Sequence, residues 1–430
     1  MEKIKDLILS FIGILLYSFF YKNFIYKSRS TISKYQFKKI KNLLIECSNN
    51  VPYYKKLFKD IGFNPQTDFQ SIQDLEKIPI LNQQTVRENR LDFLNQKSRF
   101  YVKMKTSGTS GSPFKSRVSF RHWIVEQSVI WRQWKSFGYK FRDKMAIIRS
   151  YAPKEDEPII KIDFLRNFIF YSPYHLTDDN MDIYYSDMKK RKIKFLRGYP
   201  SSIKIFAEYC YKKKYSFKYL KGILLASETL TDNDKIFMKK VFNVPVINHY
   251  GLAECVVMIG NIESDKLLYN YEDYGYLEAI KLSDNQYSLI GTNLNNYSMP
   301  LIRYNTNDII EIDKKNNSNS KINFQKIKKI LGRGNEYIIS QYKKIPLTNI
   351  YTTFAKYTEI SKFQIIQENI NFVRVIINLN SDSHSNVEQR LTEDLNFLNH
   401  EKISFKLDFS SNFLKFNEGK IPTFVTYEKK

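Results

Sequence analysis

The spacing of apolar residues predicts alternating strands and helices through the middle of the chain. Residues 33–49 have helical spacing, which Val51-Pro52 ends. Further along, the strands are expected at 100–104, 145–148, 195–196, 223–226 and 244–247, and the helices at 121–137, 201–214 and 232–242. Short β-runs separated by amphipathic helices are typical of a parallel or mixed sheet that helices cover on both faces.

The pattern changes after Val256, where hairpin-like strands replace the alternation. They are expected at 276–280, 287–290, 301–304 and 309–312, and they predict a β-rich subdomain packed on the first sheet. The polar residues 313–325 resemble a loop. Beyond Gly332, the chain is expected to form strands at 363–366, 372–375 and 403–409 and a helix at 387–398.

The chain is therefore expected to have an α/β fold in three parts. An apolar helix is expected within residues 1–30. A large domain over residues 31–331 holds mixed sheets covered by helices, together with the β-rich subdomain. A small α+β domain over residues 332–430 follows it.

The apolar run from Leu7 to Tyr21, which Phe24-Ile25-Tyr26 extends, allows three interpretations. Spanning a bilayer takes about 20 apolar residues, so the run is short for a span. Flanking lysines and aromatic residues over 7–26 favour a helix docked on a membrane surface or a partner. A buried helix of a soluble fold is the second interpretation, and a true span the third. No small-residue cleavage site follows, which argues against a secretory signal.

Composition narrows the range of functions. The 430 residues carry a formal charge of +24 from lysines spread over the whole length, without a recognisable RNA- or DNA-binding motif. Nucleic acid is therefore not an expected partner, whereas a basic surface favours anionic small molecules such as ATP. The 3 cysteines lie far apart and form no metal spacing with the 5 histidines. A reduced, cytoplasmic protein without zinc is expected.

A cluster of hydroxyls and glycines is the first candidate for chemistry. Thr106-Ser107-Gly108-Thr109-Ser110-Gly111 follows the strand expected at 100–104. Glycines let the backbone turn so that several N–H groups point inward, and hydroxyls add donors for phosphate oxygens. A strand followed by such a loop holds a triphosphate in many proteins, although no Walker A sequence is present here. An ordinary surface turn is the alternative.

Four later motifs supply charged groups that a nucleotide site uses. Glu254, in Tyr250-Gly251-Leu252-Ala253-Glu254, lies just past an expected strand, where α/β proteins bind ligands, and its carboxylate suits Mg²⁺. Asp308 is placed at the end of an apolar strand to accept ribose hydroxyls. Arg333 lies between glycines at the expected domain boundary, and Lys420 lies on a late Gly/Pro loop. Each of them alone is equally a solvated loop or turn residue.

Taken in order, these motifs resemble those of the adenylate-forming (acyl-CoA synthetase-like) superfamily. The closer likeness is to its phenylacetate–CoA ligase and capsular-polysaccharide CapK-type branch, and it runs from about residue 35 to the C-terminus. The stretches that support the branch are Val51-Pro52-Tyr53-Tyr54, Leu75-Glu76-Lys77-Ile78-Pro79, Arg197-Gly198-Tyr199-Pro200-Ser201 and Phe363-Gln364-Ile365-Ile366-Gln367.

The resemblance implies how ATP would be held. The loop Thr106–Gly111 would wrap the β- and γ-phosphates, with Thr106 among the catalytic groups. Tyr250 and Gly251 would lie near adenine, and Ser227-Glu228-Thr229 would line the nucleotide side.

It also implies which groups act on the reacting atoms. Asp308 would hold the ribose hydroxyls, Arg333 would contact ribose or phosphate, and Glu254 would bind Mg²⁺. Lys420 would bridge the carboxylate and the α-phosphate. The C-terminal domain would be a mobile lid that rotates about a hinge near Asn335, where the family usually has Asp.

The implied activity is ATP-dependent, AMP-forming activation of a carboxylic acid, followed by transfer to a thiol, amine or hydroxyl. The CapK-type branch suggests cell-surface polysaccharide biosynthesis, with a sugar or amino sugar as acceptor. An aryl-acid CoA ligase is one alternative, and a non-catalytic nucleotide-binding scaffold is another. ATP and Mg²⁺ are the expected cofactors, and CoA is a candidate acceptor. The expected location is the cytoplasm, at the inner face of the membrane if residues 7–26 dock there.

Overall fold

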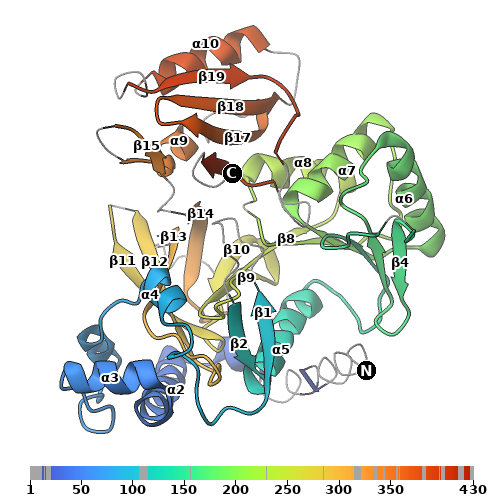
Figure 1. The fold of residues 1–430 in the computed structure, drawn as a ribbon. Coiled ribbons are helices and arrows are strands. Elements are labelled where there is room, and N and C mark those ends of the chain that lie inside the picture. The colour runs from blue at the N-terminus through green and yellow to red at the C-terminus, as the bar shows by residue number, and fades with distance from the viewer. Residues whose placement is uncertain are drawn as a thin grey trace.

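The chain folds into a large part that contains a long sheet and a smaller C-terminal part that lies above it in Figure 1. The computed structural model describes residues 12–13, 15, 21–105, 115–154, 156–228, 230–283, 285–313, 321–333, 337–341, 344–354, 357, 359–379, 384–396, 398, 402–414 and 421–426.

A mixed sheet of 12 strands runs through the large part, in the order β11-β12-β13-β14-β10-β9-β8-β7-β6-β3-β5-β4. Its strands are β3 (Met145–Ile148), β4 (Ile160–Asp163), β5 (Phe168–Tyr171), β6 (Phe195–Gly198), β7 (Gly222–Ala226), β8 (Val246–Gly251), β9 (Met258–Ile262), β10 (Ser264–Asn270), β11 (Gly275–Lys281), β12 (Gln286–Asn293), β13 (Tyr304–Ile312) and β14 (Lys326–Arg333). Strands β5, β3, β6, β7 and β8 pair in parallel, and from β8 towards β11 every pair is antiparallel. The expected α/β fold is confirmed, and the change of pattern after Val256 coincides with the change from parallel to antiparallel pairing.

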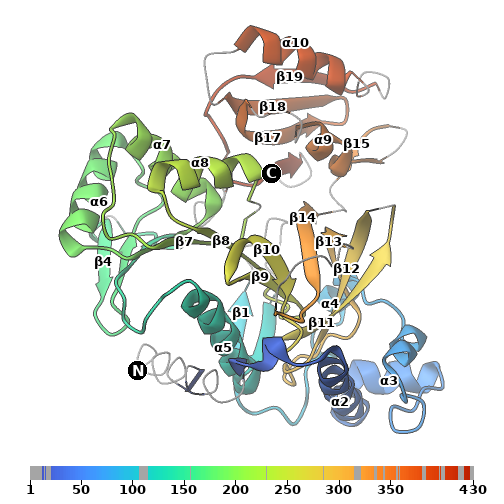
Figure 2. The ribbon, with the colours of Figure 1, turned by 180° about the vertical axis from the view of Figure 1, so that it is seen from behind.

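Helices cover both faces of the parallel strands because the side chains of those strands are apolar on both faces. Ala146 and Ile148 of β3 pack on the side of α6 (Asp178–Arg191), α7 (Pro200–Lys212) and α8 (Asp232–Phe242). Met145 and Ile147 point to the opposite side, in a cluster that includes Trp131 of α5 (Phe120–Ser136). Figure 2 shows α5 and the group α6–α8 on either side of these strands.

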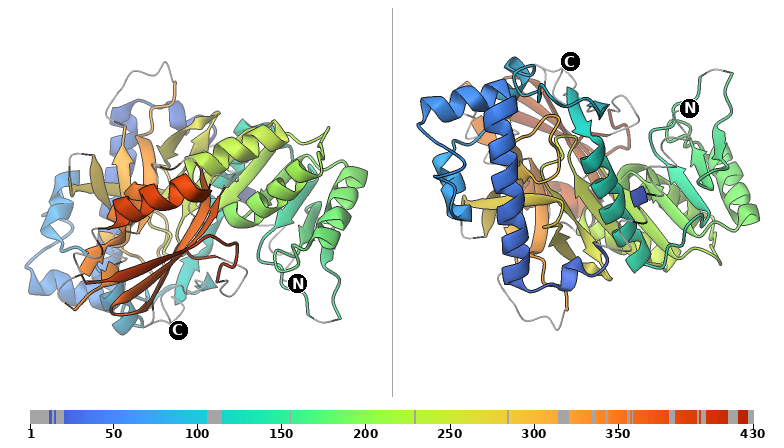
Figure 3. Two further views of the ribbon diagram at one scale, coloured as in Figure 1. Left: turned by 90° about the horizontal axis from the view of Figure 1, so that it is seen from above. Right: turned by 90° about the horizontal axis from the view of Figure 1, so that it is seen from below.

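The N-terminal helices pack against the antiparallel half of the sheet. They are α2 (Arg29–Asn50), α3 (Pro52–Asp60) and α4 (Gln83–Glu88), with short 3-10 turns η2 (Phe24–Tyr26) and η3 (Ile72–Lys77). Leu43 and Leu44 are fully buried in one cluster with strand residues such as Leu289 and Ile310. Figure 3 shows α2 lying along this half of the sheet.

The described part of the N-terminal apolar run packs on the protein's own core. Ile25 is 2% exposed, and the Phe24 ring lies 4.8 Å from that of Tyr35. Within the described residues, no helix combines the length and the hydropathy needed to cross a bilayer. These contacts place the 3-10 turn Phe24–Tyr26 on the protein's own core, and the choice among the three interpretations of residues 7–21 stays open.

The glycine-rich loop joins two strands of a separate hairpin. β1 (Tyr101–Lys105) and β2 (Lys115–Ser119) are antiparallel, with Lys105 opposite Lys115. The loop residues between them lie outside the described residues. The strand expected at 100–104 is confirmed.

The C-terminal part has its own four-stranded sheet, in the order β19-β18-β17-β20. Its elements are β15 (Tyr337–Ile339), β16 (Lys344–Pro346), α9 (Leu347–Phe354), β17 (Ile360–Asn369), β18 (Phe372–Leu379), α10 (His384–Leu395), β19 (Ser404–Asp408) and β20 (Phe424–Thr426). A separate apolar cluster, with Leu391 and Val373 in its centre, lies between this sheet and the helices. Strand β14, which belongs to the large part, continues to Arg333.

One expectation for the β-rich region, the strand at 301–304, was wrong over its first three residues. Residues 301–303 are not a strand, because side chains rather than a neighbouring strand accept their N–H groups. Leu301 N donates to Asn293 Oδ1 (2.5 Å), and Arg303 N donates to Thr292 Oγ1 (2.9 Å). The antiparallel strands of the β-rich region continue the large sheet.

Candidate active site

The carboxyl ends of the parallel strands bring the predicted nucleotide residues to one edge of the sheet. His249, Tyr250 and Gly251 end β8, and Ala226 at the end of β7 lies opposite His249. Ser227 follows directly, with a left-handed φ of 74°. Ligands of α/β proteins bind outside the carboxyl ends of such strands.

Tyr250 and Asp308 meet although they come from different strands. The Tyr250 hydroxyl donates a hydrogen bond to Asp308 Oδ2 (2.5 Å). Asp308 is 7% exposed, and in the β13–β14 ladder it lies opposite Arg333. Burial, and then the charge of Asp308, raise the pKa of Tyr250 well above its ordinary value, so the phenol stays a donor at neutral pH. Three predicted nucleotide residues are thus neighbours in space.

Glu254 lies beside this pair and is held in place by its neighbours. The Tyr304 hydroxyl donates to Glu254 Oε1 (3.0 Å), and Asn293 Nδ2 donates to the Glu254 backbone carbonyl (3.1 Å). Glu254 is 7% exposed. A carboxylate oxygen fixed in this way is a hard ligand of the kind that Mg²⁺ prefers, so the residue fits the metal that the resemblance implies.

Glu228 is engaged with the protein itself. It accepts from Ser201 N (3.0 Å) and from Ser201 Oγ (3.1 Å), in the first turn of α7. A carboxylate at a helix N-terminus is favourable for the unpaired N–H groups there. The Glu228 side chain therefore anchors the loop after β7 on α7, and the role expected for it towards the nucleotide stays a prediction.

Several predicted site residues cannot be placed in this geometry. Thr106–Gly111, Thr229, Asn335 and Lys420 lie outside the described residues, as does the side chain of Arg333. Their expected roles stay predictions. The described flanks Lys105 and Lys115 lie at the open end of the β1–β2 hairpin, where a loop must join them.

Sequence reasoning assigned no role to two arginines at the same edge. Arg197 lies in β6 with its guanidinium carbon 4.8 Å from the centre of the Trp134 ring of α5. Arg149 follows β3, lies over the ring of Tyr199 at 5.1 Å, and donates to Ser227 Oγ at 3.4 Å. The sequence could have marked both arginines as candidates, because each comes at the end of an apolar run that predicts a strand.

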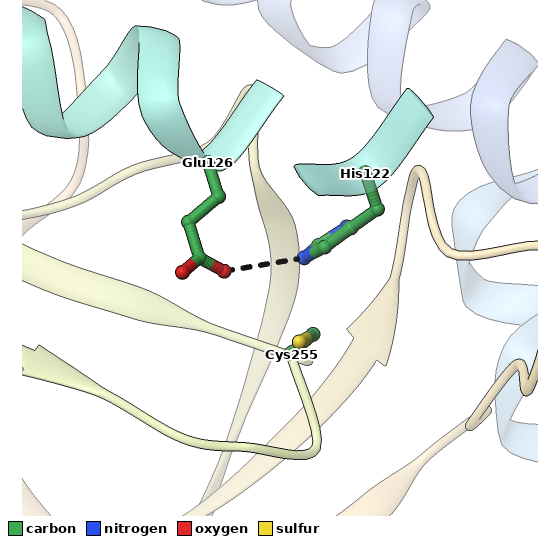
Figure 4. A group of neighbouring side chains, drawn as sticks. All are labelled: His122, Glu126 and Cys255. Atoms are coloured by element: carbon green, nitrogen blue, oxygen red, sulfur yellow. Dashed lines mark ion pairs between the residues drawn. The ribbon is translucent and has the colours of Figure 1, made fainter. Parts of the chain in front are cut away.

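A buried polar cluster lies below this edge, between α5 and the loop after β8 (Figure 4). His122 Nε2 lies 3.7 Å from Glu126 Oε2, and one ligand atom each from His122, Glu126 and Cys255 lie within 4.8 Å of one another. The Tyr274 hydroxyl donates to Glu126 (2.9 Å). An imidazole, a carboxylate and a thiol form a donor set that suits Zn²⁺ better than Mg²⁺. The expectation of a protein without zinc stays a prediction.

The fold is that of solved adenylate-forming ligases. A crystal structure of 2-hydroxyisobutyryl-CoA ligase in the postadenylation state, in complex with R3-HIB-AMP, matches with a TM-score of 0.69 at 14% identity, over 93% of this chain and 90% of that one. An open conformation of that ligase in complex with 2-HIB-AMP and CoA matches with a TM-score of 0.60 at 12% identity, over 91% of each chain. These likenesses show that the chain has the fold of adenylate-forming ligases.

Within that class, the sequence is similar to Protein CapK of Staphylococcus aureus. The two are 23% identical over 375 residues, which cover 84% of this chain and 81% of that protein. No family model matches the chain. The resemblance to the superfamily and to its CapK branch is confirmed.

Proposed function

We propose that the protein is an AMP-forming ligase that activates a carboxylic acid with ATP and passes the acyl group to a thiol, amine or hydroxyl. The observation that carries the proposal is the meeting of Tyr250, Glu254 and Asp308 at the carboxyl edge of the sheet. A bound ATP needs an aromatic ring beside adenine, a carboxylate for the metal ion and a carboxylate for the ribose hydroxyls. The fold shared with adenylate-forming ligases supports the same conclusion.

In the first step, a carboxylate oxygen of the acid attacks the α-phosphorus of ATP. The bond from that phosphorus to the bridging oxygen breaks, and pyrophosphate leaves with the electron pair. Mg²⁺ at Glu254 would neutralise phosphate charge during this step. Because an anion attacks an anion, catalysis rests on positioning and charge neutralisation. Lys420 is proposed to supply one positive charge at the reacting carboxylate, and Thr106–Gly111 to hold the leaving pyrophosphate.

In the second step, the acceptor attacks the acyl carbon, the bond to the AMP oxygen breaks, and the acceptor loses a proton. Similarity to Protein CapK supports an acceptor in cell-surface polysaccharide biosynthesis, such as a sugar or amino sugar. CoA as acceptor is the second candidate, because the 2-hydroxyisobutyryl-CoA ligase structure contains it. The use of ATP and the buried free thiols support a cytoplasmic location.

The test is ATP–pyrophosphate exchange over a panel of carboxylic acids, with and without CoA. Acid-dependent exchange is expected, and folded protein that exchanges with no acid would falsify the proposal. Lys420→Ala should abolish adenylate formation and spare transfer from a supplied acyl-adenylate. Lys406→Ala is the matched control, because Lys406 is an exposed lysine on β19.

A further inference from the structure

Two arginines lie on the same face of neighbouring parallel strands. Arg197 of β6 lies opposite Ile147 of β3 and opposite Leu224 of β7. Because side chains alternate along a strand, Arg197 shares the face of Ile147 and Leu224, which is the face that α5 covers. Arg149 lies two residues beyond Ile147, and His249 lies two residues beyond Ile247. Both Ile147 and Ile247 belong to the face that α5 covers, so Arg149 and His249 follow it nearer the carboxyl edge. The two arginines and the histidine therefore line the space between α5 and this edge.

The partners of Arg149 and Arg197 are aromatic rings and a hydroxyl. Within the described residues, no Asp or Glu oxygen lies at ion-pair distance from Arg149 or Arg197. Burial, and then the charge of Arg149, lower the pKa of Arg197 to about 9. Burial is also the main reason why the pKa of His249 is lowered to about 4; the charge of Glu126 opposes this shift, and the charges of both arginines add to it.

Elsewhere the fold pairs its buried arginines. Arg132, also on α5 and 2% exposed, donates to both carboxylate oxygens of Asp273. Arg303 is 7% exposed and is paired with Glu278 at 3.0 Å. Arg149 and Arg197 are half-buried, and two like charges side by side repel each other. An anion that arrives with a ligand would neutralise both guanidinium groups.

We infer that the activated acid carries a second anionic group, a carboxylate or a phosphate ester, which Arg197 and Arg149 bind. This inference rests on the proposed function. The nucleotide residues Tyr250 and Asp308 lie at and beyond β8, whereas Arg197 lies two strands from β8 in the opposite direction. Neighbouring strands are about 4.8 Å apart, so the second anion lies roughly 10 Å from β8. A guanidinium fork matches the oxygens of either group.

The test compares acids of equal length with and without the second charge. Adipate and hexanoate form one pair, suberate and octanoate another, and each is assayed by ATP–pyrophosphate exchange. The wild type should favour the dianion in kcat/KM. Arg197→Met should lose about 100-fold for the dianion, mainly through KM, and little for the monocarboxylate. Arg142→Met is the matched control, because Arg142 is an exposed arginine that donates to the Phe164 carbonyl.

The outcomes separate the two proposals. If the wild type does not favour the dianion over the monocarboxylate, or if Arg197→Met loses no more with the dianion than with the monocarboxylate, the second anion is overturned and the ligase still stands. If no acid supports exchange, calorimetric titration of the full chain with adipate in the presence of ATP decides about the pocket. Binding that Arg197→Met abolishes and Arg142→Met retains supports the anion pocket. Absence of binding, or binding that does not depend on Arg197, overturns it.

Discussion

The hydrogen bond between Tyr250 and Asp308 allows a quantitative test of the nucleotide site. Tyr250→Phe keeps the ring and removes the hydroxyl that lies 2.5 Å from Asp308 Oδ2. A hydrogen bond to a charged group contributes about 1.5–3 kcal/mol, and a buried carboxylate that loses a donor bears that cost. Because the pKa of Tyr250 is raised well above its ordinary value, chiefly by burial, the bond is present over the whole neutral and mildly alkaline range.

The variant should therefore lose about 1.5–3 kcal/mol of unfolding free energy in guanidinium titrations. If Asp308 holds the ribose, the same loosening should raise the KM for ATP by about tenfold, since about 1.4 kcal/mol corresponds to a factor of ten. Tyr219→Phe is the matched control, because Tyr219 is 42% exposed.

A double-mutant cycle with Asp308→Asn isolates the pair. A coupling energy of at least about 1 kcal/mol is expected for groups in direct contact. If Tyr250→Phe and Tyr219→Phe agree in stability to within about 0.5 kcal/mol, the bond is not formed in solution. If Tyr250→Phe loses the expected stability but keeps an unchanged KM for ATP, the proposed role of Asp308 in holding the ribose is rejected.

Three further predictions concern titration, thiols and the N-terminus. The pKa of His249 is lowered to about 4, mainly by burial, so the unfolded chain binds a proton that the folded chain does not between pH 6.5 and pH 4. Stability should fall as the pH is lowered through this window, and His249→Gln should flatten the fall; an unchanged slope would contradict the burial of the imidazole. All 3 cysteines are buried and free, so a thiol reagent should modify none of them in the native protein and 3 after unfolding. Deletion of residues 1–30 removes Ile25 from the core, and we expect aggregation or a loss of about 2–5 kcal/mol; a stable truncated protein released from membranes would favour the docked helix.

The spacing of apolar residues predicted most strands and helices, but it did not show which strands pair with one another. The strands at 145–148, 223–226 and 244–247 were predictable because each is a short apolar run that follows an amphipathic helix. The predicted strand at 301–304 was wrong over 301–303, where the side chains of Asn293 and Thr292 accept the N–H groups of Leu301 and Arg303. Such side-chain acceptors leave no mark on the spacing of apolar residues.

In the site, too, local motifs could be found in the sequence, whereas contacts that depend on the folded arrangement could not. The motifs carry Tyr250, Glu254 and Asp308, and the order of the motifs marked them as candidates. The hydroxyl of Tyr304 that holds Glu254 was not predictable, since nothing in the sequence shows where its side chain points. Arg149 and Arg197 meet because β3 pairs with β6 and not with β4, the strand that follows it along the chain. Strand order depends on the packing of whole helices and cannot be derived from short stretches.

The charged groups on the two sides of strand β8 differ in sign. On the side of β13 lie the carboxylates Asp308 and Glu254, which suit ribose and a metal ion. On the side of β6 lie two cations without carboxylate partners among the described residues. In the proposed reaction, the carboxylate would have to reach the α-phosphate near Tyr250, and the rest of the acid would then extend towards β6. A dianionic acid would be repelled by the triphosphate, and the cations on the side of β6 offset that repulsion before the reacting carboxylate meets the phosphorus.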